Sequence, residues 1–368
     1  MKKRWYLLIV ALVSLSMVLA ACGGGADKKE GTSDNAGKDE KTEATEDFKA
    51  AMVTDIGGVD DKSFNQSAWE GLNAWGEEHG LKEKENFDYA QSTTKADYMP
   101  NITRLVRDDY NMIFAIGFEL KEDVEKAADQ YKDTHFAIVD DIVEKDNVAS
   151  VVFKEHQGSF LVGVAAAMKT KTNKVGFVGG IDSPLINKFE SGFIAGVKSV
   201  NPDIEVDVQY AESFGAADKG KIIASNMYNN DIDIIYHAAG GTGNGVFNEA
   251  KDLKKSDPDR ELWVIGVDRD QHEEGQIGDH NITLTSMVKR VDVAVHDITN
   301  KAMNGEHHGG ETLEYGIEEE GISVATTNED AMTQDIIDKV KEWEEKILNG
   351  EIDVPKTREE TEEFIKGL

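Results

Sequence analysis

From residue 48 onward, short apolar runs alternate with longer segments in which apolar residues recur at helical spacing. In the segment 63–78, Phe64, Ala68, Leu72 and Trp75 share one face of the predicted helix. The first series of elements comprises strands at 50–53, 112–116, 136–139 and 148–153 and helices at 63–78 and 122–131. Strands that alternate with helices in this way predict a parallel sheet with helices on both faces.

A second series of the same kind follows from residue 174. We expect its strands at 174–178, 204–210, 232–236, 262–267 and 282–287, and its helices at 186–200, 217–228, 246–253, 291–303 and 330–348. Two successive series predict an α/β protein of two lobes, each with a parallel sheet flanked by helices. Because ligands bind beyond the carboxyl ends of the strands in such sheets, we expect a ligand cleft between the facing lobes.

The first 22 residues have the pattern of an export signal. A basic start at 2–4 precedes the apolar stretch 5–19, which is too short to span a bilayer as a helix. The stretch ends in Leu19-Ala20-Ala21-Cys22, which resembles a bacterial lipobox, and Cys22 is the chain's one cysteine. We therefore expect residues 1–21 to be a lipoprotein signal peptide and Cys22 to carry a lipid anchor.

Composition predicts a flexible tether and argues against nucleic acid as a partner. Residues 22–47 contain no large apolar side chain, so we expect a flexible tether that cannot fold alone. The chain carries 40 basic and 71 acidic residues, a formal charge of −31. Because such a surface repels phosphate backbones, we expect no nucleic acid partner.

Polar and aromatic residues follow the first predicted strand. Asp55 lies where the strand stops, and Ser63 is placed to cap the following helix, whose first turn contains Phe64 and Asn65. In a binding site, Asp55 and Asn65 would form hydrogen bonds to a ligand and Phe64 would stack on it. In the plainer alternative, Asp55 is a turn residue and Phe64 belongs to the core.

A glycine-rich segment, 237–247, follows the strand 232–236. Its spacing lacks the Gly-Lys-Ser/Thr end of a P-loop and the glycine pattern of a dinucleotide-binding fingerprint. We expect its backbone to approach a sugar or base closely, with Phe247 covering the ligand.

Charged residues end three more strands. Asp140 and Asp268 follow strands directly, and Lys289 lies just beyond the strand 282–287. A carboxylate accepts two hydrogen bonds at once, which suits the paired hydroxyls of a ribose.

Signatures of an enzyme or a metal site are missing from the sequence. There is no His-Glu-x-x-His and no Gly-x-Ser-x-Gly, and the segment 268–270 lacks the spacing of a calcium loop. We therefore predict no enzyme activity, metal or cofactor, although two carboxylates in a cleft would suffice for a hydrolase.

Four segments, 55–69, 179–196, 237–247 and 266–271, together resemble the basic membrane protein (Bmp) family, the PnrA-like group of bacterial lipoproteins. The resemblance covers most of residues 48–350. It implies a type I periplasmic-binding-protein fold and an extracellular protein, lipid-anchored to the cell membrane of a Gram-positive bacterium. It also implies capture of nucleosides, purine nucleosides above all, for an ABC permease.

The resemblance also implies roles for single residues. Phe64 and Phe247 would sandwich the base, with Phe118 as a competing aromatic residue. Asp55, Asn65 and Asp140 would form hydrogen bonds to the base.

The ribose contacts follow from the same resemblance. Asp268 and Lys289 would hold the ribose hydroxyls, and Gly241 would lend a backbone contact. A ligand that contacts both lobes would favour a closed form, which the permease would recognise.

The expected lobes are 48–157, with a returning segment at about 285–305, and 158–284, with about 306–368. Other functions stay open, namely a binder of a sugar, a short peptide or another small solute, a ligand sensor for a kinase, or a surface antigen without a transport role. A repressor of the same core fold is excluded because the signal and tether occupy the place of its N-terminal DNA-binding domain.

The lipobox interpretation is tested by Cys22→Ser. Because the thiol of Cys22 is the only site for thioether lipidation, the variant should be released from membranes into the soluble fraction. Immunoblotting of membrane pellet and supernatant measures this release. A variant that stays in the pellet would place the anchor elsewhere.

Overall fold

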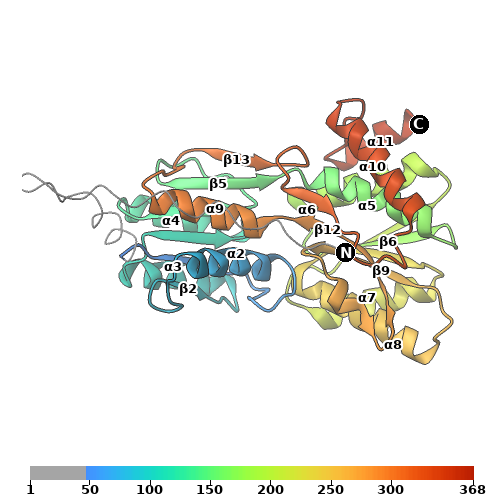
Figure 1. The fold of residues 1–368 in the computed structure, drawn as a ribbon, viewed down its shortest axis with the longest axis horizontal. Helices are drawn as coiled ribbons and strands as arrows, with labels where there is room; N and C mark the ends of the chain where they lie inside the picture. The colour runs from blue at the N-terminus through green and yellow to red at the C-terminus, as the bar shows by residue number, and fades with distance from the viewer. Residues whose placement is uncertain (1–46) are drawn as a thin grey trace, which may run out of the picture. The chain divides into compact units, whose positions relative to one another are not determined.

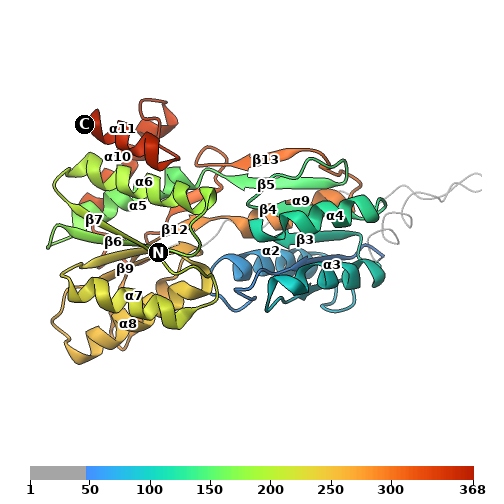
Figure 2. The ribbon, with the colours of Figure 1, turned by 180° about the vertical axis from the view of Figure 1, so that it is seen from behind.

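The computed structural model describes residues 47–368. The predicted signal peptide, Cys22 and the predicted tether up to residue 46 lie outside the described residues. The described chain builds two six-stranded sheets, each flanked by helices (Figures 1 and 2). The predicted α/β architecture of two lobes is thereby confirmed.

The first sheet has the order β13-β5-β4-β3-β1-β2, and all its neighbouring strands are parallel. Its strands are β1 (Ala50–Val53), β2 (Phe87–Ala90), β3 (Met112–Ile116), β4 (His135–Val139), β5 (Val148–Phe153) and β13 (Thr312–Tyr315). Its helices are α2 (Phe64–Glu78), α3 (Tyr98–Arg107), α4 (Lys121–Gln130) and α9 (Val291–Met303). Ala50 and Met52 of β1 join the core on the α2 side, whereas Ala51 and Val53 pack on the α3 side. The strands are therefore apolar on both faces, as a doubly covered sheet requires.

The second sheet repeats this order as β14-β12-β9-β8-β6-β7. Its strands are β6 (Lys174–Gly179), β7 (Glu205–Tyr210), β8 (Ile234–Ala238), β9 (Trp263–Asp268), β12 (Thr283–Lys289) and β14 (Ile322–Val324). Only β14 is antiparallel to its neighbour in this sheet. Its helices are α5 (Glu155–Lys169), α6 (Pro184–Val200), α7 (Ala217–Asn229), α8 (Gly243–Ser256), α10 (Gln334–Leu348) and α11 (Arg358–Lys366).

Short elements complete the chain. They are the hairpin β10 (Gln276–Ile277) and β11 (His280–Asn281) and the 3-10 turns η1 (Lys95–Asp97), η2 (Phe118–Leu120), η3 (Gly240–Thr242) and η4 (His272–Gly275). In both sheets the strand order reverses beside the first strand, between β1 and β3 and between β6 and β8. Loops separate at such a reversal, which leaves a crevice at the carboxyl ends.

Within the described residues, the chain passes between the sheets after β5, after β12 and after β13. The returning segment differs from the expected 285–305, because β12 stays in the second sheet as far as Lys289 and the first sheet gains β13 at 312–315. The spacing of apolar residues alone could not show where the chain returns to the first sheet, since the end of a strand and a crossover segment have the same pattern of apolar residues.

The returning helix α9 packs closely on α2. A Cβ at Gly71 would collide with the backbone carbonyl of Asp292, and the hydroxyl of Ser67 accepts a hydrogen bond from the Asp292 amide (3.2 Å). Glycine at this position lets the two backbones come into contact.

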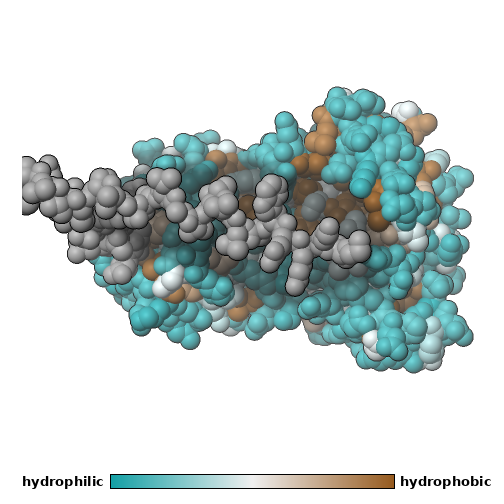
Figure 3. Space-filling model, in the orientation of Figure 1, coloured by the Kyte–Doolittle hydropathy of each residue, from teal (hydrophilic) through white to brown (hydrophobic). Residues whose placement is uncertain are grey.

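The face seen in Figure 3 is mostly hydrophilic outside the grey atoms, with smaller hydrophobic areas. Across residues 47–368, none of the helices has both the length and the apolar character to cross a bilayer.

Gly71→Val should therefore destabilise the protein by about 1–3 kcal/mol through overpacking between α2 and α9. Ala74→Val introduces the same side chain at an exposed position of the same helix. It should cost less than about 1 kcal/mol, which is the helix propensity difference. Urea unfolding followed by circular dichroism measures both. Equal losses would show that the close approach at Gly71 does not limit stability.

Candidate functional site

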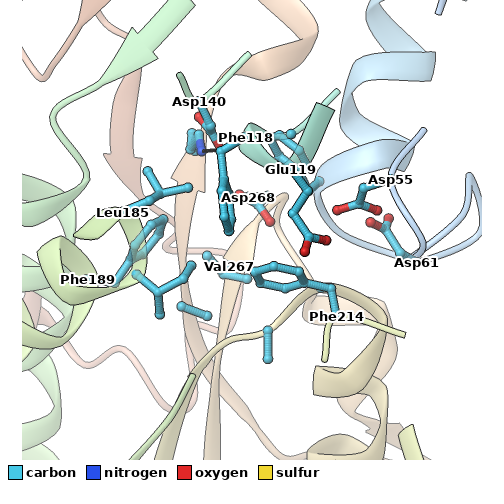
Figure 4. Close-up of a pocket in the computed structure, with 17 residues that line it drawn as sticks. Asp55, Asp61, Phe118, Glu119, Asp140, Leu185, Phe189, Phe214, Val267 and Asp268 are labelled. Atoms are coloured by element: carbon cyan, nitrogen blue, oxygen red, sulfur yellow. Dashed lines mark hydrogen bonds and ion pairs between the residues drawn. The ribbon is translucent and has the colours of Figure 1, made fainter. Parts of the chain in front are cut away.

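A cavity lies where the carboxyl ends of the two sheets face each other (Figure 4). Its lining residues come from both lobes: Asp55, Asp61, Phe64, Gly117, Phe118, Glu119, Asp140, Leu185, Ile186, Phe189, Phe214, Ala238, Ala239, Gly240, Val267, Asp268 and Lys289. The carboxyl groups of Asp55, Asp61 and Glu119 lie on one side, and Leu185 and Phe189 lie on the opposite side (Figure 4).

The loop between β1 and α2 organises one wall. Ser63 occupies the N-cap position of α2 as expected, but its side chain makes no capping hydrogen bond. The carboxylate of Asp61 instead accepts hydrogen bonds from the amides of Ser63 (2.9 Å) and Asn65 (2.9 Å). Since the Ser63 hydroxyl is not needed at the helix start, it donates across the cleft to Asp268.

Asp55 is buried at the end of β1. Its Oδ1 accepts hydrogen bonds from Asn65 Nδ2 (2.8 Å) and from the Gly57 amide (2.7 Å). Burial raises the pKa of Asp55 to about 7, with a further contribution from Asp61, although the hydrogen bond from Asn65 opposes the rise. Near neutral pH this carboxyl group can therefore either accept or donate a hydrogen bond to a ligand.

Lys289 is a buried cation at the end of β12, with a side chain only 1% exposed. Its Nζ lies 2.6 Å from Asp140 Oδ2 and 3.6 Å from Glu155 Oε1. Burial alone would lower the pKa of Lys289, but the carboxylates of Asp140, Glu155 and Asp268 raise it overall. Burial raises the pKa of Asp140, against the attraction of Lys289. Lys289 is therefore positively charged, and Asp140 Oδ1 is a buried acceptor without a protein partner.

Asp140 and Asp268 occupy equivalent places in the two lobes. Asp140 directly follows β4 and Asp268 is the last residue of β9, and each of these strands is the third from the β13 or β14 edge of its sheet. Both residues have a left-handed backbone conformation, with φ of 74° and 66°. Non-glycine residues in this conformation are uncommon and gather at functional sites. Burial raises the pKa of Asp268 to about 6, although Lys289 and Ser63 oppose the rise.

Hydrogen bonds also join the two lobes around the cavity. Besides the contact of Ser63 with Asp268, the pairs are Gln271 with the Lys62 carbonyl (2.9 Å), Asn244 with the Asp61 carbonyl (3.1 Å) and Arg269 with Glu70 (2.7 and 2.9 Å). The described conformation is therefore one in which the lobes have closed on each other.

Aromatic rings from both lobes surround the cavity. Phe118 and Phe214 meet edge to face at 6.1 Å, and the Lys289 ammonium lies 4.9 Å from the ring centre of Phe64. Phe247 does not reach the cavity, because it is 1% exposed and packs in a hydrophobic cluster behind the sheet. The expectation that Phe247 covers the ligand is therefore wrong, whereas the competing residue Phe118 does line the cavity.

The glycine-rich segment has mixed uses. Gly240, with φ of 53°, lines the cavity, and Gly241 lies beside it, where a Cβ would come 3.2 Å from the Phe214 carbonyl oxygen. Gly243 and Gly245 instead allow close packing, since a Cβ would collide with His237 or with the Ala217 carbonyl. No group of three or more His, Cys, Asp and Glu side chains placed to hold a metal ion occurs among residues 47–368.

Comparison with known proteins decides the family. Residues 48–358 match the Bmp family, described as ABC transporter substrate-binding protein PnrA-like. A protein of Listeria innocua named CD4+ T-cell-stimulating antigen is 49% identical over 363 residues, which cover 96% of this chain and 99% of that protein. The chain belongs to the Bmp family. It is a substrate-binding protein of an ABC transporter, from a family of binding proteins rather than enzymes.

Other relatives of this Bmp protein agree. The ABC transporter nucleoside-binding protein BmpA of Lactococcus lactis is 41% identical over 362 residues, covering 96% of this chain and 99% of that protein. A solute-binding protein of an ABC transporter system from Aeropyrum pernix K1 superposes with a TM-score of 0.76 at 25% identity, covering 87% of this chain and 98% of that one. The type I periplasmic-binding-protein fold is thereby confirmed.

Most predicted site residues of this Bmp protein come together. Asp55, Phe64, Asp140, Asp268 and Lys289 line the cavity, and their contacts with a ligand stay a prediction. Asn65 lies behind Asp55 and is 1% exposed.

Among the lining residues that sequence reasoning missed are Asp61, Glu119 and Phe214. Phe214 lies in the loop that follows the strand predicted at 204–210, so a search of every strand end would have found it. Glu119 follows the strand at 112–116 in the same way. Asp61 lies within the loop after the first strand, a few residues beyond the strand end, so a search confined to strand ends does not reach it.

The buried carboxyl groups of the Bmp protein predict a pH dependence. Because the pKa of Asp55 rises from 3.8 in the unfolded chain to about 7, the folded state holds a proton that the unfolded state loses. This stabilisation is present at low pH and is lost as the pH rises through about 7. The unfolding free energy of ligand-free protein should therefore fall as the pH rises from 5 to 8.

Asp55→Asn should flatten that fall by an amount on the order of a few kcal/mol. Denaturant titrations at a series of pH values measure it. Asp60→Asn, an exposed carboxylate in the same loop, should keep the wild-type profile. An unchanged profile in Asp55→Asn would contradict the burial of an ionisable Asp55.

Proposed function

We propose that this protein captures nucleosides, purine nucleosides above all, and delivers them to an ABC permease. The observation that carries the proposal is the chemistry of the cavity, which combines aromatic rings with buried hydrogen-bonding charges. Phe64, Phe118 and Phe214 offer apolar faces and edges to a base, and stacking on an aromatic ring contributes roughly 1–3 kcal/mol per base.

The charged residues suit a ribose. Asp268 accepts hydrogen bonds and Lys289 donates them, so paired hydroxyls would find both kinds of partner. Asp140 Oδ1 is buried without a protein partner, and such an atom is costly unless a ligand or water satisfies it. The Lactococcus relative, named a nucleoside-binding protein, supports the same choice of ligand.

Closure follows from the contacts between the lobes. A nucleoside that touches Asp55 on one lobe and Asp268 on the other gains its full contacts only when the cleft is shut. It therefore shifts the protein toward the closed form by its differential affinity for that form. The permease would then recognise the closed protein, held at the extracellular face of the membrane by lipid on Cys22.

Asp268→Asn tests the ribose contact. Asparagine tolerates the left-handed backbone at this position, so the fold should be kept. Affinity for inosine should fall by about 1.5–3 kcal/mol, roughly tenfold to hundredfold, since a charged hydrogen-bond acceptor is lost. Calorimetry of protein that has been unfolded, freed of ligand and refolded measures this loss.

The controls distinguish the contact from a general effect. Asp60→Asn removes an exposed carboxylate from the loop between β1 and α2 and should bind inosine as the wild type does. 2′,3′-Dideoxyinosine, which lacks the hydroxyls, should lose no further affinity in Asp268→Asn. If wild-type protein binds sugars but no nucleoside, the proposed function is wrong.

A further inference from the structure

Glu119 carries an unused acceptor inside the cavity. It lies in η2, directly beyond β3, and its side chain is only 3% exposed. Lys95 Nζ contacts one carboxylate oxygen, Oε1, at 2.6 Å. The other oxygen, Oε2, is buried and has no hydrogen-bond partner in the protein. A buried carboxylate oxygen without a partner is costly, so this atom is placed for a donor that the ligand supplies.

The surroundings of Glu119 also favour a donor on the ligand. The carboxyl groups of Asp55 and Asp61 lie on the same side of the cavity (Figure 4), and the charges of Asp61 and Glu119 both contribute to the raised pKa of Asp55. Asp61 is occupied by the backbone amides at the start of α2. Glu119 and Asp55 thus present oxygen atoms to whatever edge of the ligand reaches this side.

The cation Lys289 lies away from this side. It pairs with Asp140 and Glu155, and its largest electrostatic partners are these two residues and Asp268. The cavity is therefore divided between an end that holds hydroxyls and an end that accepts N–H donors. Phe118 and Phe214 stand next to the second end, where a planar ring would pack.

We propose that Glu119 determines specificity by accepting a hydrogen bond from an amino group on the purine ring, so that guanosine binds more tightly than inosine. Inosine is guanosine without the 2-amino group, and it leaves Glu119 Oε2 unpaired. A site built around a buried acceptor discriminates strongly against a ligand that lacks the matching donor. This inference rests on the proposed nucleoside function and adds which nucleoside is preferred and which residue selects it.

The test measures the affinity ratio of guanosine to inosine by calorimetry. The protein is the full-length chain in detergent micelles, unfolded and refolded to remove bound ligand. Wild-type protein should favour guanosine by roughly tenfold to hundredfold, the range for a hydrogen bond to a charged group. In Glu119→Met, which keeps the side-chain length without a carboxylate, the ratio should fall to about one, with inosine affinity unchanged or raised.

A second ligand pair checks the chemical group. 2,6-Diaminopurine riboside and adenosine differ by the same 2-amino group, so their ratio should fall in parallel in Glu119→Met. The matched control is Glu122→Met, the same substitution at an exposed position of α4, which should keep both wild-type ratios. Thermal unfolding of each variant shows that the fold is intact.

The remaining outcomes separate failure of the role of Glu119 from failure of the proposed function. A guanosine preference that persists in Glu119→Met overturns the role of Glu119, and so does an equal loss for both ligands of a pair, which would indicate a contact with the shared ribose. A wild-type protein that binds both nucleosides equally also overturns it. In these cases the proposed function stands, whereas a wild-type protein that binds no nucleoside overturns the proposed function as well.

Discussion

The buried ammonium of Lys289 is the interaction on which both fold and site depend. A charge taken out of water is stable only when opposite charges and hydrogen bonds replace its hydration. Here the partners come from separate parts of the chain. Asp140 ends a strand of the first sheet, Asp268 ends a strand of the second, and Glu155 begins the helix after the first crossover. The lysine is thus satisfied only when both sheets and a crossover are in place.

The same charged groups also determine the energetics of cleft closure. Separating the lobes would take Asp140 away from Lys289 unless water replaced it, and would break the contact of Ser63 with Asp268. Closing them buries several carboxyl groups, three of which have a raised pKa of about 6 to 7. Donors on a ligand relieve that burial, so ligand binding and closure favour each other.

The order of strands and helices and the polar residues at strand ends could be predicted from the sequence. Asp55, Asp140 and Asp268 were found because strand ends in parallel sheets share one edge. Phe247 was placed wrongly because the turn η3 precedes α8, which sets Phe247 against the sheet and next to His237. Gly243 and Gly245 allow close packing between elements, and the number of glycines in a segment does not reveal that use.

The helices α3, α5 and α11 also escaped prediction, the first two for reasons that the structure shows. The helix α5 is buried on nearly all sides, so its apolar residues show no helical period. The helix α3 is short and begins directly after a 3-10 turn, in a segment without a clear pattern. The strand β13 could not be foreseen either, because its place in the first sheet depends on where the chain crosses over.

The equivalent positions of Asp140 and Asp268 mean that the two lobes are copies of one pattern that meet face to face. Their neighbouring strands correspond too, since Val151 pairs with Val139, just before Asp140, as Met287 pairs with Val267, just before Asp268. Two residues farther along these neighbouring strands the likeness breaks, because the residue is Phe153 in one lobe and Lys289 in the other. A duplicated frame would receive a ligand equally well in either direction. Exchanges such as this one, together with the carboxyl groups that only the first lobe supplies, make the two ends of the cavity chemically different and so favour a single orientation of the ligand.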